Sequence, residues 1–149
     1  MYDDILLATD GSVASENATA HAVELAAAHD ATLHVLFVVD SEVYSAYSGD
    51  EYVDEREGPE HGLEEVGEET LDAVRETAAD HGVDTVEELR HGVPHEEVVR
   101  YADENDVDLL VLGTKRLPDE YRSLLGSVTD RVVRTAERPV LVVKTPVQS

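Results

Sequence analysis

Apolar residues recur along this chain in two patterns, which predict alternating strands and helices. Short continuous apolar runs bounded by polar residues predict buried strands at residues 5–9, 32–39, 83–89, 108–112 and 139–143. Apolar positions three or four residues apart predict helices between these strands. The chain therefore alternates strand and helix from its first residues to its last.

Each helix has its own apolar positions and, in two cases, a start signal. Ser12 is expected to cap the first helix, and Pro94 opens the third, with Glu96 and Glu97 in its first turn. Apolar faces are expected at Ala18, Ala22, Leu25 and Ala26 in the first helix and at Leu63, Val66, Leu71, Val74 and Ala78 in the second. The last helix has an apolar stripe at Val128, Val132, Val133 and Ala136.

Five strands alternating with four helices predict an α/β fold, a five-stranded parallel sheet with helices on both faces. Such sheets bind ligands at the carboxyl ends of their strands. Asp10 follows the first strand and Gly113 follows the fourth, so both are expected at the ligand edge. A length of 149 residues fits one domain, which we expect to span residues 1–149.

The segment from Asp40 to Gly62 interrupts this alternation, because it is acidic and has no apolar periodicity. Loops of more than about 15 residues in compact domains are usually lids, binding segments or disordered. Tyr44, Tyr47 and Tyr52 lie here. The segment is either a solvated loop or a lid over the ligand edge, with a tyrosine available to stack on a ligand.

A glycine-punctuated sequence follows the fourth strand. It begins with Gly113-Thr114-Lys115-Arg116 and, nine residues later, continues with Gly126-Ser127-Val128-Thr129 at the start of the last helix. A helix start presents free backbone amides and a partial positive charge to an anion, and glycine lets the backbone approach closely. This arrangement predicts a phosphate site and favours a nucleotide-binding protein.

Charge and composition exclude several partners and settings. The chain has 34 acidic residues, 11 basic residues (only two of them lysine) and no cysteine, for a net charge of −23. Such a surface repels nucleic acids and anionic membranes, so we expect neither as a partner. The missing cysteines, the acidic N-terminus and the short apolar runs together favour a cytoplasmic protein. The pattern resembles proteins of extreme halophiles, and we expect dilute buffer to loosen the fold.

Other chemistry has little support in the sequence. His91 and His95 are separated by Gly92 and Pro94, so they do not share a helix face, and no metal site is expected. Asp10 alone does not make the acidic pocket of a phospho-acceptor domain. Walker, Gly-x-Gly-x-x-Gly and nucleophile-elbow motifs are absent from the sequence.

Three segments, in the right order, resemble the universal stress protein family. They are Thr9-Asp10-Gly11-Ser12, the helix entry Gly92-Val93-Pro94, and Leu124-Leu125-Gly126-Ser127-Val128 with the later Arg138-Pro139-Val140-Leu141-Val142-Val143. The resemblance implies the strand order 3-2-1-4-5, as in adenine nucleotide α-hydrolase-like folds. It also implies a homodimer through the fifth strand, between Val140 and Val143, which would cover an apolar edge.

The ATP-binding branch of this family has the motif Gly-x2-Gly-x9-Gly-Ser/Thr. Here Gly113 and Gly126-Ser127 match, whereas Arg116 replaces the second glycine. The resemblance implies that the ligand is an adenine nucleotide such as ATP, bound with or without Mg²⁺. The residues that it implies as contacts are Ala8, Thr9, Asp10, Val38, Gly113, Thr114, Arg116, Gly126, Ser127 and Val128. In that set Asp10 contacts the ribose, the backbone near Ala8, Thr9 and Val38 frames the adenine, and Gly126, Ser127 and Val128 hold the phosphates. Arg116 either grips phosphate or holds the backbone away from it.

Three functions remain open at this point. The first is a stress-response regulator, a homodimer that senses or buffers ATP and hydrolyses it slowly at most, because no general base is evident. The second is a nucleotide-free interaction module that acts through an unknown protein partner. The third is an enzyme of the related α-hydrolase type, for which we find no catalytic pair in the sequence.

Overall fold

The computed structural model describes residues 2–10, 13–40, 59–115 and 127–145 of the chain. In this part of the chain, the predicted strands and helices are present, although some of their bounds differ. In chain order they are β1 (Asp4–Thr9), α1 (Val13–His29), β2 (Thr32–Asp40), α3 (Pro59–Asp80), β3 (Thr85–Gly92), α4 (Pro94–Glu104), β4 (Leu109–Lys115), α5 (Ser127–Thr135) and β5 (Val140–Thr145).

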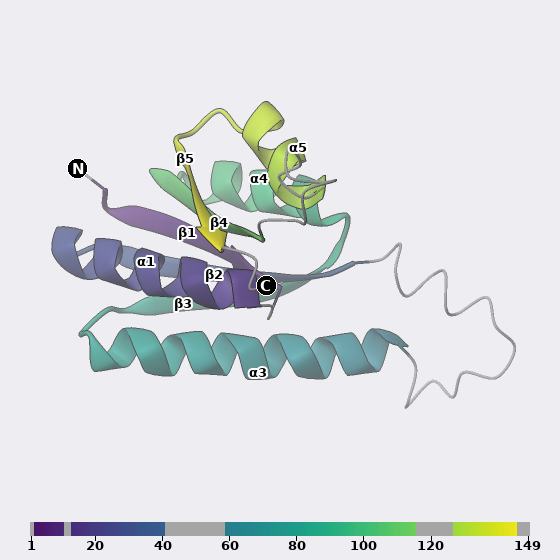
Figure 1. Cartoon of the computed structure of the whole chain (residues 1–149), viewed down its shortest axis with the longest axis horizontal. Coiled ribbons are helices and arrows are strands. Elements are labelled where there is room, and N and C mark those ends of the chain that lie inside the picture. Colours follow the sequence, from purple (N-terminus) through teal and green to yellow (C-terminus); the bar gives the residue numbers. More distant parts are fainter. Residues whose placement is uncertain (1, 11–12, 41–58, 116–126, 146–149) are drawn as a thin grey trace, which may run out of the picture.

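The strands form one parallel sheet in the order β3-β2-β1-β4-β5. The predicted fold class and strand order are therefore confirmed. Helices α1 and α3 cover one face of the sheet, and α4 and α5 cover the other (Figure 1). The chain reverses its winding direction between β1 and β4, which places a crevice at the carboxyl ends of these two strands.

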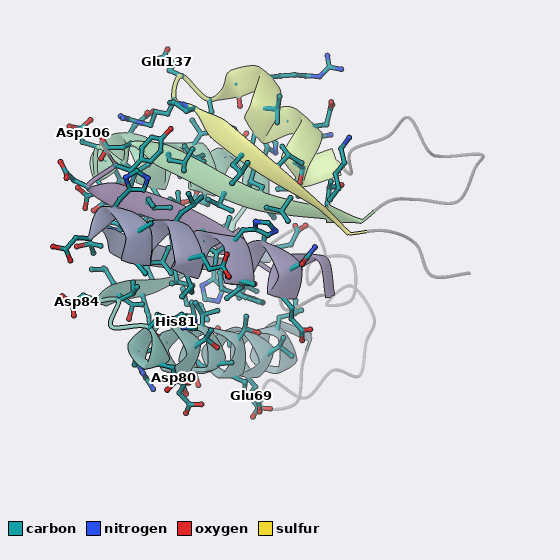
Figure 2. The ribbon with its side chains drawn as sticks, turned by 60° about the vertical axis from the view of Figure 1, so that its left-hand side comes forward. Glu69, Asp80, His81, Asp84, Asp106 and Glu137 are labelled. Carbon is teal, nitrogen blue, oxygen red and sulfur yellow. The ribbon has the colours of Figure 1, made fainter. Side chains whose placement is uncertain are left out.

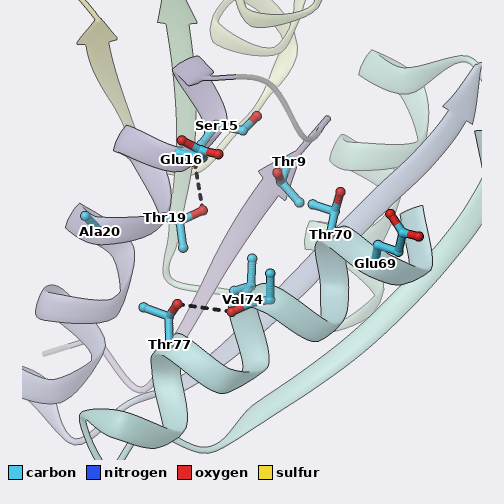
Figure 3. A pocket seen from close by; sticks show the side chains of 10 residues that line it. Thr9, Ser15, Glu16, Thr19, Ala20, Glu69, Thr70, Val74 and Thr77 are labelled. Carbon is cyan, nitrogen blue, oxygen red and sulfur yellow. Dashed lines mark hydrogen bonds between the residues drawn. The ribbon is translucent and has the colours of Figure 1, made fainter. Parts of the chain in front are cut away.

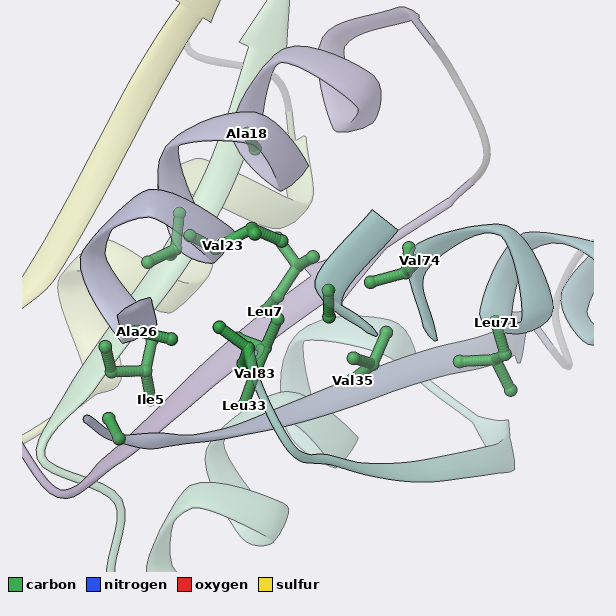
Figure 4. Packing of buried hydrophobic residues seen from close by; sticks show 14 of the residues in the cluster. Ile5, Leu7, Ala18, Val23, Ala26, Leu33, Val35, Leu71, Val74 and Val83 are labelled. Carbon is green, nitrogen blue, oxygen red and sulfur yellow. The ribbon is translucent and has the colours of Figure 1, made fainter. Parts of the chain in front are cut away.

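The face under α1 and α3 is an apolar layer, which Figure 4 shows from close by. Ile5 and Leu7 of β1 point to this face because side chains alternate along a strand. The short side chains of Ala18, Ala22 and Ala26, all fully buried, let α1 pack closely on the sheet. Leu71, Val74 and Ala78 bury α3 on the same layer.

The face under α4 and α5 has a smaller apolar cluster that includes Leu6 of β1. A chain of polar groups lies beside it. His34 Nε2 is 2.9 Å from Asp4 Oδ1, and His34 Nδ1 is 2.7 Å from the hydroxyl oxygen of Tyr101. Burial raises the pKa of Tyr101, and the Arg90 guanidinium lies 5.0 Å from the centre of its ring. This face therefore combines apolar packing with buried hydrogen bonds.

Asp108, the residue before β4, is hydrogen-bonded to the start of β1. Its Oδ2 atom accepts hydrogen bonds from the backbone N–H groups of Asp3, at 2.8 Å, and Asp4, at 3.0 Å. These two hydrogen bonds from Asp4 and Asp3 lower the pKa of Asp108, because they favour the ionised carboxylate.

Two residues predicted on apolar faces are exposed. Val66 is 44% exposed, and the neighbouring Gly67 instead faces the sheet. At 100° per residue, position 67 lies at the centre of the face formed by Leu63, Leu71, Val74 and Ala78, whereas position 66 lies beside it. Val133 of α5 is 41% exposed, although Val132 next to it is fully buried. In each of these two helices, the predicted apolar face therefore includes one residue that is exposed.

Several predicted boundaries were also wrong. β3 begins at Thr85 and continues to Gly92, because its backbone pairs with β2 through charged positions as well as apolar ones. Gly113 does not end the fourth strand, since β4 continues to Lys115 by pairing with β5. Helix α3 begins at Pro59, so the predicted 40–62 segment is partly helical. The three tyrosines of that segment, and Ser12, lie outside the described residues.

Acidic side chains project outward from α3, as Glu69 and Asp80 do in Figure 2, and from the connections between elements, as Asp84, Asp106 and Glu137 do. Within the described residues, no helix combines the length and the apolar character that a membrane span requires.

Candidate functional site

A cavity of about 260 Å³, which we call the strand-end pocket, lies at the carboxyl ends of β1, β2 and β4. The strands contribute Ala8, Thr9, Leu36, Phe37, Val38, Asp40, Leu112 and Gly113, and Asp10 directly follows β1. The helices contribute Ser15, Leu63, Pro94, Val98, Val128 and Thr129. Most of these side chains are apolar, and the polar ones come from the ends of the elements, as in many small-molecule sites.

The end of β1 is fixed by two reciprocal hydrogen bonds. The backbone N–H of Asp10 donates to Ser15 Oγ at 3.0 Å, and the Ser15 hydroxyl donates to Asp10 Oδ1 at 2.7 Å. Ser15 is buried in the first turn of α1, so this pair joins the end of β1 to the start of α1. The Asp10 carboxylate is thereby held at the rim of the pocket.

The start of α5 is joined to β4 in a similar way. The Thr129 hydroxyl, which is buried, donates to the carbonyl oxygen of Gly113 at 3.1 Å. This bond holds the first turn of α5 beside the strand that leads toward it. Because a helix start has a partial positive charge and unpaired backbone amides, this end of the pocket favours an anion.

Six of the residues predicted to contact a ligand line this one pocket, from three separate strands and α5. They are Ala8, Thr9, Asp10, Val38, Gly113 and Val128. Thr114 is buried in β4 but does not line the pocket, and Ser127 is the first residue of α5. Arg116 and Gly126 lie outside the described residues.

Sequence reasoning missed other residues of the pocket. Thr129, two residues after Ser127 in the first turn of α5, was not predicted to line the site, yet it lines the pocket and its hydroxyl bonds to Gly113. Asp40 was not predicted as a ligand contact either, although it is the last residue of β2 and lines the pocket. Its position after a buried strand was the signal that could have identified it.

The electrostatics of the pocket are unusual for a site that takes an anion. Asp10 and Asp40 both line it, whereas its described lining contains neither lysine nor arginine. The basic pair Lys115 and Arg116 follows Gly113 directly in sequence. An anionic ligand would therefore need the helix start, those basic residues or a bound cation to balance the carboxylates.

Histidines do not assemble a metal centre in the described part of the chain. His91 Nε2 lies 2.7 Å from Glu64 Oε1, a pairing between β3 and α3. Among the residues that the structure describes, no group of three or more His, Asp or Glu side chains could hold a metal ion.

Fold and pocket define the class of this protein: a doubly wound α/β protein with a ligand pocket at the switch point of its sheet. Comparison with known proteins narrows this class. The model of the universal stress protein family matches residues 1–144, and the chain belongs to this family.

Relatives and solved structures agree with this assignment. A universal stress protein of Methanocaldococcus jannaschii is 37% identical over 149 residues, covering 98% of this chain and 84% of the relative. The structure of a universal stress protein in complex with cAMP is 26% identical, with a TM-score of 0.66 and coverage of 96% and 97% of the two chains. An Archaeoglobus fulgidus universal stress protein in complex with dAMP has the same fold at 23% identity, with a TM-score of 0.68 and coverage of 96% and 98%.

Proposed function

We propose that this chain binds ATP in the strand-end pocket and acts as a regulatory protein in a stress response. The observation that carries the proposal is that one pocket collects six of the residues expected to contact an adenine nucleotide. A family member 26% identical to this chain was crystallised with cAMP, which supports an adenine nucleotide as the ligand class.

The proposed pose follows from the chemistry of the pocket walls. The apolar end, with Val38, Leu36 and Leu112, suits the flat adenine ring, and Asp10 can accept hydrogen bonds from the ribose hydroxyls. The phosphates would then lie toward Val128 at the start of α5, with Gly126 and Ser127 before it. Arg116, which replaces a motif glycine, would bind the terminal phosphates through two charge-assisted hydrogen bonds from its guanidinium group.

A divalent cation such as Mg²⁺ fits this pose. Asp10 and Asp40 are hard oxygen donors that line the same pocket as the proposed nucleotide. Because Mg²⁺ usually binds to phosphates with one or two carboxylates, a full set of protein ligands is not needed. The cation would neutralise the repulsion between the two carboxylates and the triphosphate. We expect hydrolysis to be slow at most.

The proposed regulator is a homodimer that pairs through β5. This edge strand has the sequence Val-Leu-Val-Val-Lys-Thr, whereas the opposite edge, β3, carries Glu87, Glu88 and Arg90. Charged edge strands resist pairing and apolar ones invite it. The test is the solution mass of Leu141→Lys, which should be that of a monomer.

The proposed function is tested by the nucleotide content of the purified protein. The protein is prepared gently in molar potassium chloride, denatured, and its released nucleotides are identified by mass spectrometry. The stripped protein is then titrated with ATP, ADP, AMP and cAMP, with and without Mg²⁺. We expect tightest binding of ATP with Mg²⁺. Protein that is empty and ignores every added nucleotide would reject the proposal and favour a nucleotide-free module that acts through a protein partner.

Three variants separate the parts of the proposal. Asp10→Asn should weaken ATP binding about tenfold, because a hydrogen bond to a charged group contributes about 1.5–3 kcal/mol. Asp80→Asn, an exposed position at the end of α3, is the control and should not change affinity. Arg116→Gly should lower ATP affinity and weaken its salt dependence; higher affinity would mean that the arginine obstructs the phosphates. Gly126→Val should abolish binding.

A further inference from the structure

A second cavity, of about 420 Å³, lies between α1 and α3, and we call it the interhelical pocket (Figure 3). It is on the sheet face opposite to α4 and α5. Helix α1 contributes Glu16, Thr19 and Ala20, and α3 contributes Glu69, Thr70, Ala73, Val74 and Thr77. Nothing in the proposed nucleotide site uses these side chains.

Three of the threonine hydroxyls that line this pocket donate their protons to backbone carbonyls. Thr19 donates to the carbonyl of Ser15 at 2.7 Å, and Thr70 to that of Val66 at 2.7 Å. Thr77 donates to the carbonyl of Ala73 at 3.0 Å. Because each hydroxyl has one proton and two lone pairs, these three threonines present acceptors to a ligand.

Ser15 lines the pocket close to the end of β1, and its oxygen already accepts the backbone N–H of Asp10 at 3.0 Å. Its proton goes to Asp10 Oδ1 at 2.7 Å. Glu16 and Glu69 add carboxylates from the two helices, and the described residues of the lining include no lysine, arginine or histidine. The polar groups of the pocket thus have an excess of hydrogen-bond acceptors and of negative charge. They favour a ligand that donates hydrogen bonds and carries positive charge.

The remaining lining restricts the body of that ligand. Val74 is buried at the base of the pocket, and Ala20 and Ala73 expose only methyl groups. A strongly hydrated metal ion gains nothing from these apolar walls, whereas a hydrocarbon chain does. An ammonium group supplies three donors, and an aliphatic chain can lie along the alanines.

We propose that the interhelical pocket binds an aliphatic amine of the diamine or polyamine class. The ammonium groups pair with Glu16 and Glu69 and donate to the threonine oxygens, while the methylene chain packs on Val74, Ala20 and Ala73. The proposal does not rest on nucleotide binding. Thr9 and Ser15 line both pockets, so the two sites share a wall but can be tested separately.

The test uses 1,5-diaminopentane as the probe and 1,5-pentanediol as a neutral ligand of the same length. Both are titrated by calorimetry into nucleotide-free protein at moderate ionic strength. We expect the diamine to bind, the diol to bind at least about tenfold more weakly, and added salt to weaken only the diamine, because screening acts on charge. No binding of the diamine, or equal binding of the two, overturns the proposal.

Variants on α3 locate the site. Glu69→Gln should weaken diamine binding about threefold to fivefold, the usual size of a partly exposed ion pair. Glu68→Gln removes the same charge one residue away, outside the pocket lining, and should have a much smaller effect. Equal losses of diamine affinity in the two variants would mean a general attraction of the diamine to an acidic helix. That result would overturn the proposal that the diamine binds in the interhelical pocket.

Filling the pocket gives an independent result. Ala73→Leu places a larger side chain in the cavity and should abolish diamine binding, whereas Ala79→Leu alters an exposed alanine of α3 outside the lining. Leucine is nearly as good a helix former as alanine, so both variants should keep α3 intact. Undiminished binding by Ala73→Leu would overturn the proposal, and ATP titration of the same variant reports separately on the strand-end pocket.

Discussion

The two faces of the sheet are built from adjacent residues of the same strands but by different means. Among the residues that the structure describes, 18 buried ones form one apolar cluster on the α1 and α3 side. On the α4 and α5 side, nine buried residues of the same described set form a smaller cluster, and the hydrogen-bonded chain Asp4–His34–Tyr101 lies beside it. Apolar packing tolerates small shifts, whereas a buried polar group needs its partner in place. The second face is therefore the more specific one, although the first buries more residues.

Leu7 and Leu6 compare the two faces directly, because both are fully buried and point to opposite sides. Leu7→Ala should lower the free energy of unfolding by about 4 kcal/mol and Leu6→Ala by about 3 kcal/mol. Helices α1 and α3, of 17 and 22 residues, cannot move into the cavity as easily as the nine-residue α5. Denaturant unfolding in potassium chloride measures both; a larger loss for Leu6→Ala would reverse the comparison.

Tyr101→Phe tests the polar chain. The variant keeps the ring and leaves His34 Nδ1 without its partner in a buried place, so it should cost about 1–3 kcal/mol. Tyr2→Phe, whose ring packs edge-on against His29 near the N-terminus, should cost less than about 0.5 kcal/mol. In a double-mutant cycle, Tyr101→Phe with His34→Leu should cost less than the sum of the single changes. Additive costs would mean that the hydrogen bond contributes nothing specific.

The same contrast explains what the sequence could predict. Alternating apolar runs and helical spacing predicted the elements, the class of fold and most of the first face, because burial there repeats with the period of the element. The polar chain could not be predicted from hydrophobic periodicity. Asp4, His34 and Tyr101 meet only through the register that pairs β1 with β2 and through the packing of α4.

The candidate site was predictable for a different reason. A doubly wound sheet brings the carboxyl ends of its strands together, so Asp10 and Gly113, near the ends of β1 and β4, could be placed at one edge. Val38, inside β2, was predicted only through the family resemblance. Thr129 and Ser15 could not be placed there, because their roles depend on hydrogen bonds to Gly113 and Asp10, which no hydrophobic periodicity specifies.

Gly67 lies where α3 packs closely on the side chains of the sheet. A methyl group at this position would come within 2.7 Å of atoms in Leu89 and Phe37, so Gly67→Ala should cost about 1–2 kcal/mol by overpacking. Gly62 lies on the same helix with nothing within 4 Å of an added methyl group. Gly62→Ala should therefore stabilise the protein by about 0.5–1 kcal/mol through helix propensity. Thermal unfolding measures both, and the same sign for the two variants would show that α3 can shift on the sheet.

Salt should affect the helices of the two faces unequally. Helix α3 has like-charged residues four apart at Glu64–Glu68, Glu65–Glu69, Glu68–Asp72, Asp72–Glu76 and Glu76–Asp80. Each such pair destabilises a helix by about 0.2–0.5 kcal/mol, so the five together cost about 1–2.5 kcal/mol. In α4, Arg100 lies four residues from both Glu96 and Glu104. Raising potassium chloride should slow hydrogen exchange in α3 by more than in α4; equal slowing would point to a uniform effect of the net charge.

The smallest effect is expected from Asp108, which holds the start of β1, where the polar chain ends at Asp4. Its pKa in the folded protein is lowered from 3.8, so the unfolded chain takes up this proton at a higher pH than the folded chain does. The carboxylate therefore stabilises the fold above about pH 4, and this contribution is lost as the pH falls through the folded pKa. Asp108→Asn should destabilise the protein at neutral pH, with a difference from the parent protein that shrinks toward acid. Asp80→Asn controls for the loss of a surface charge, and a difference that stayed constant down to acid pH would mean that Asp108 acts through its shape rather than its charge.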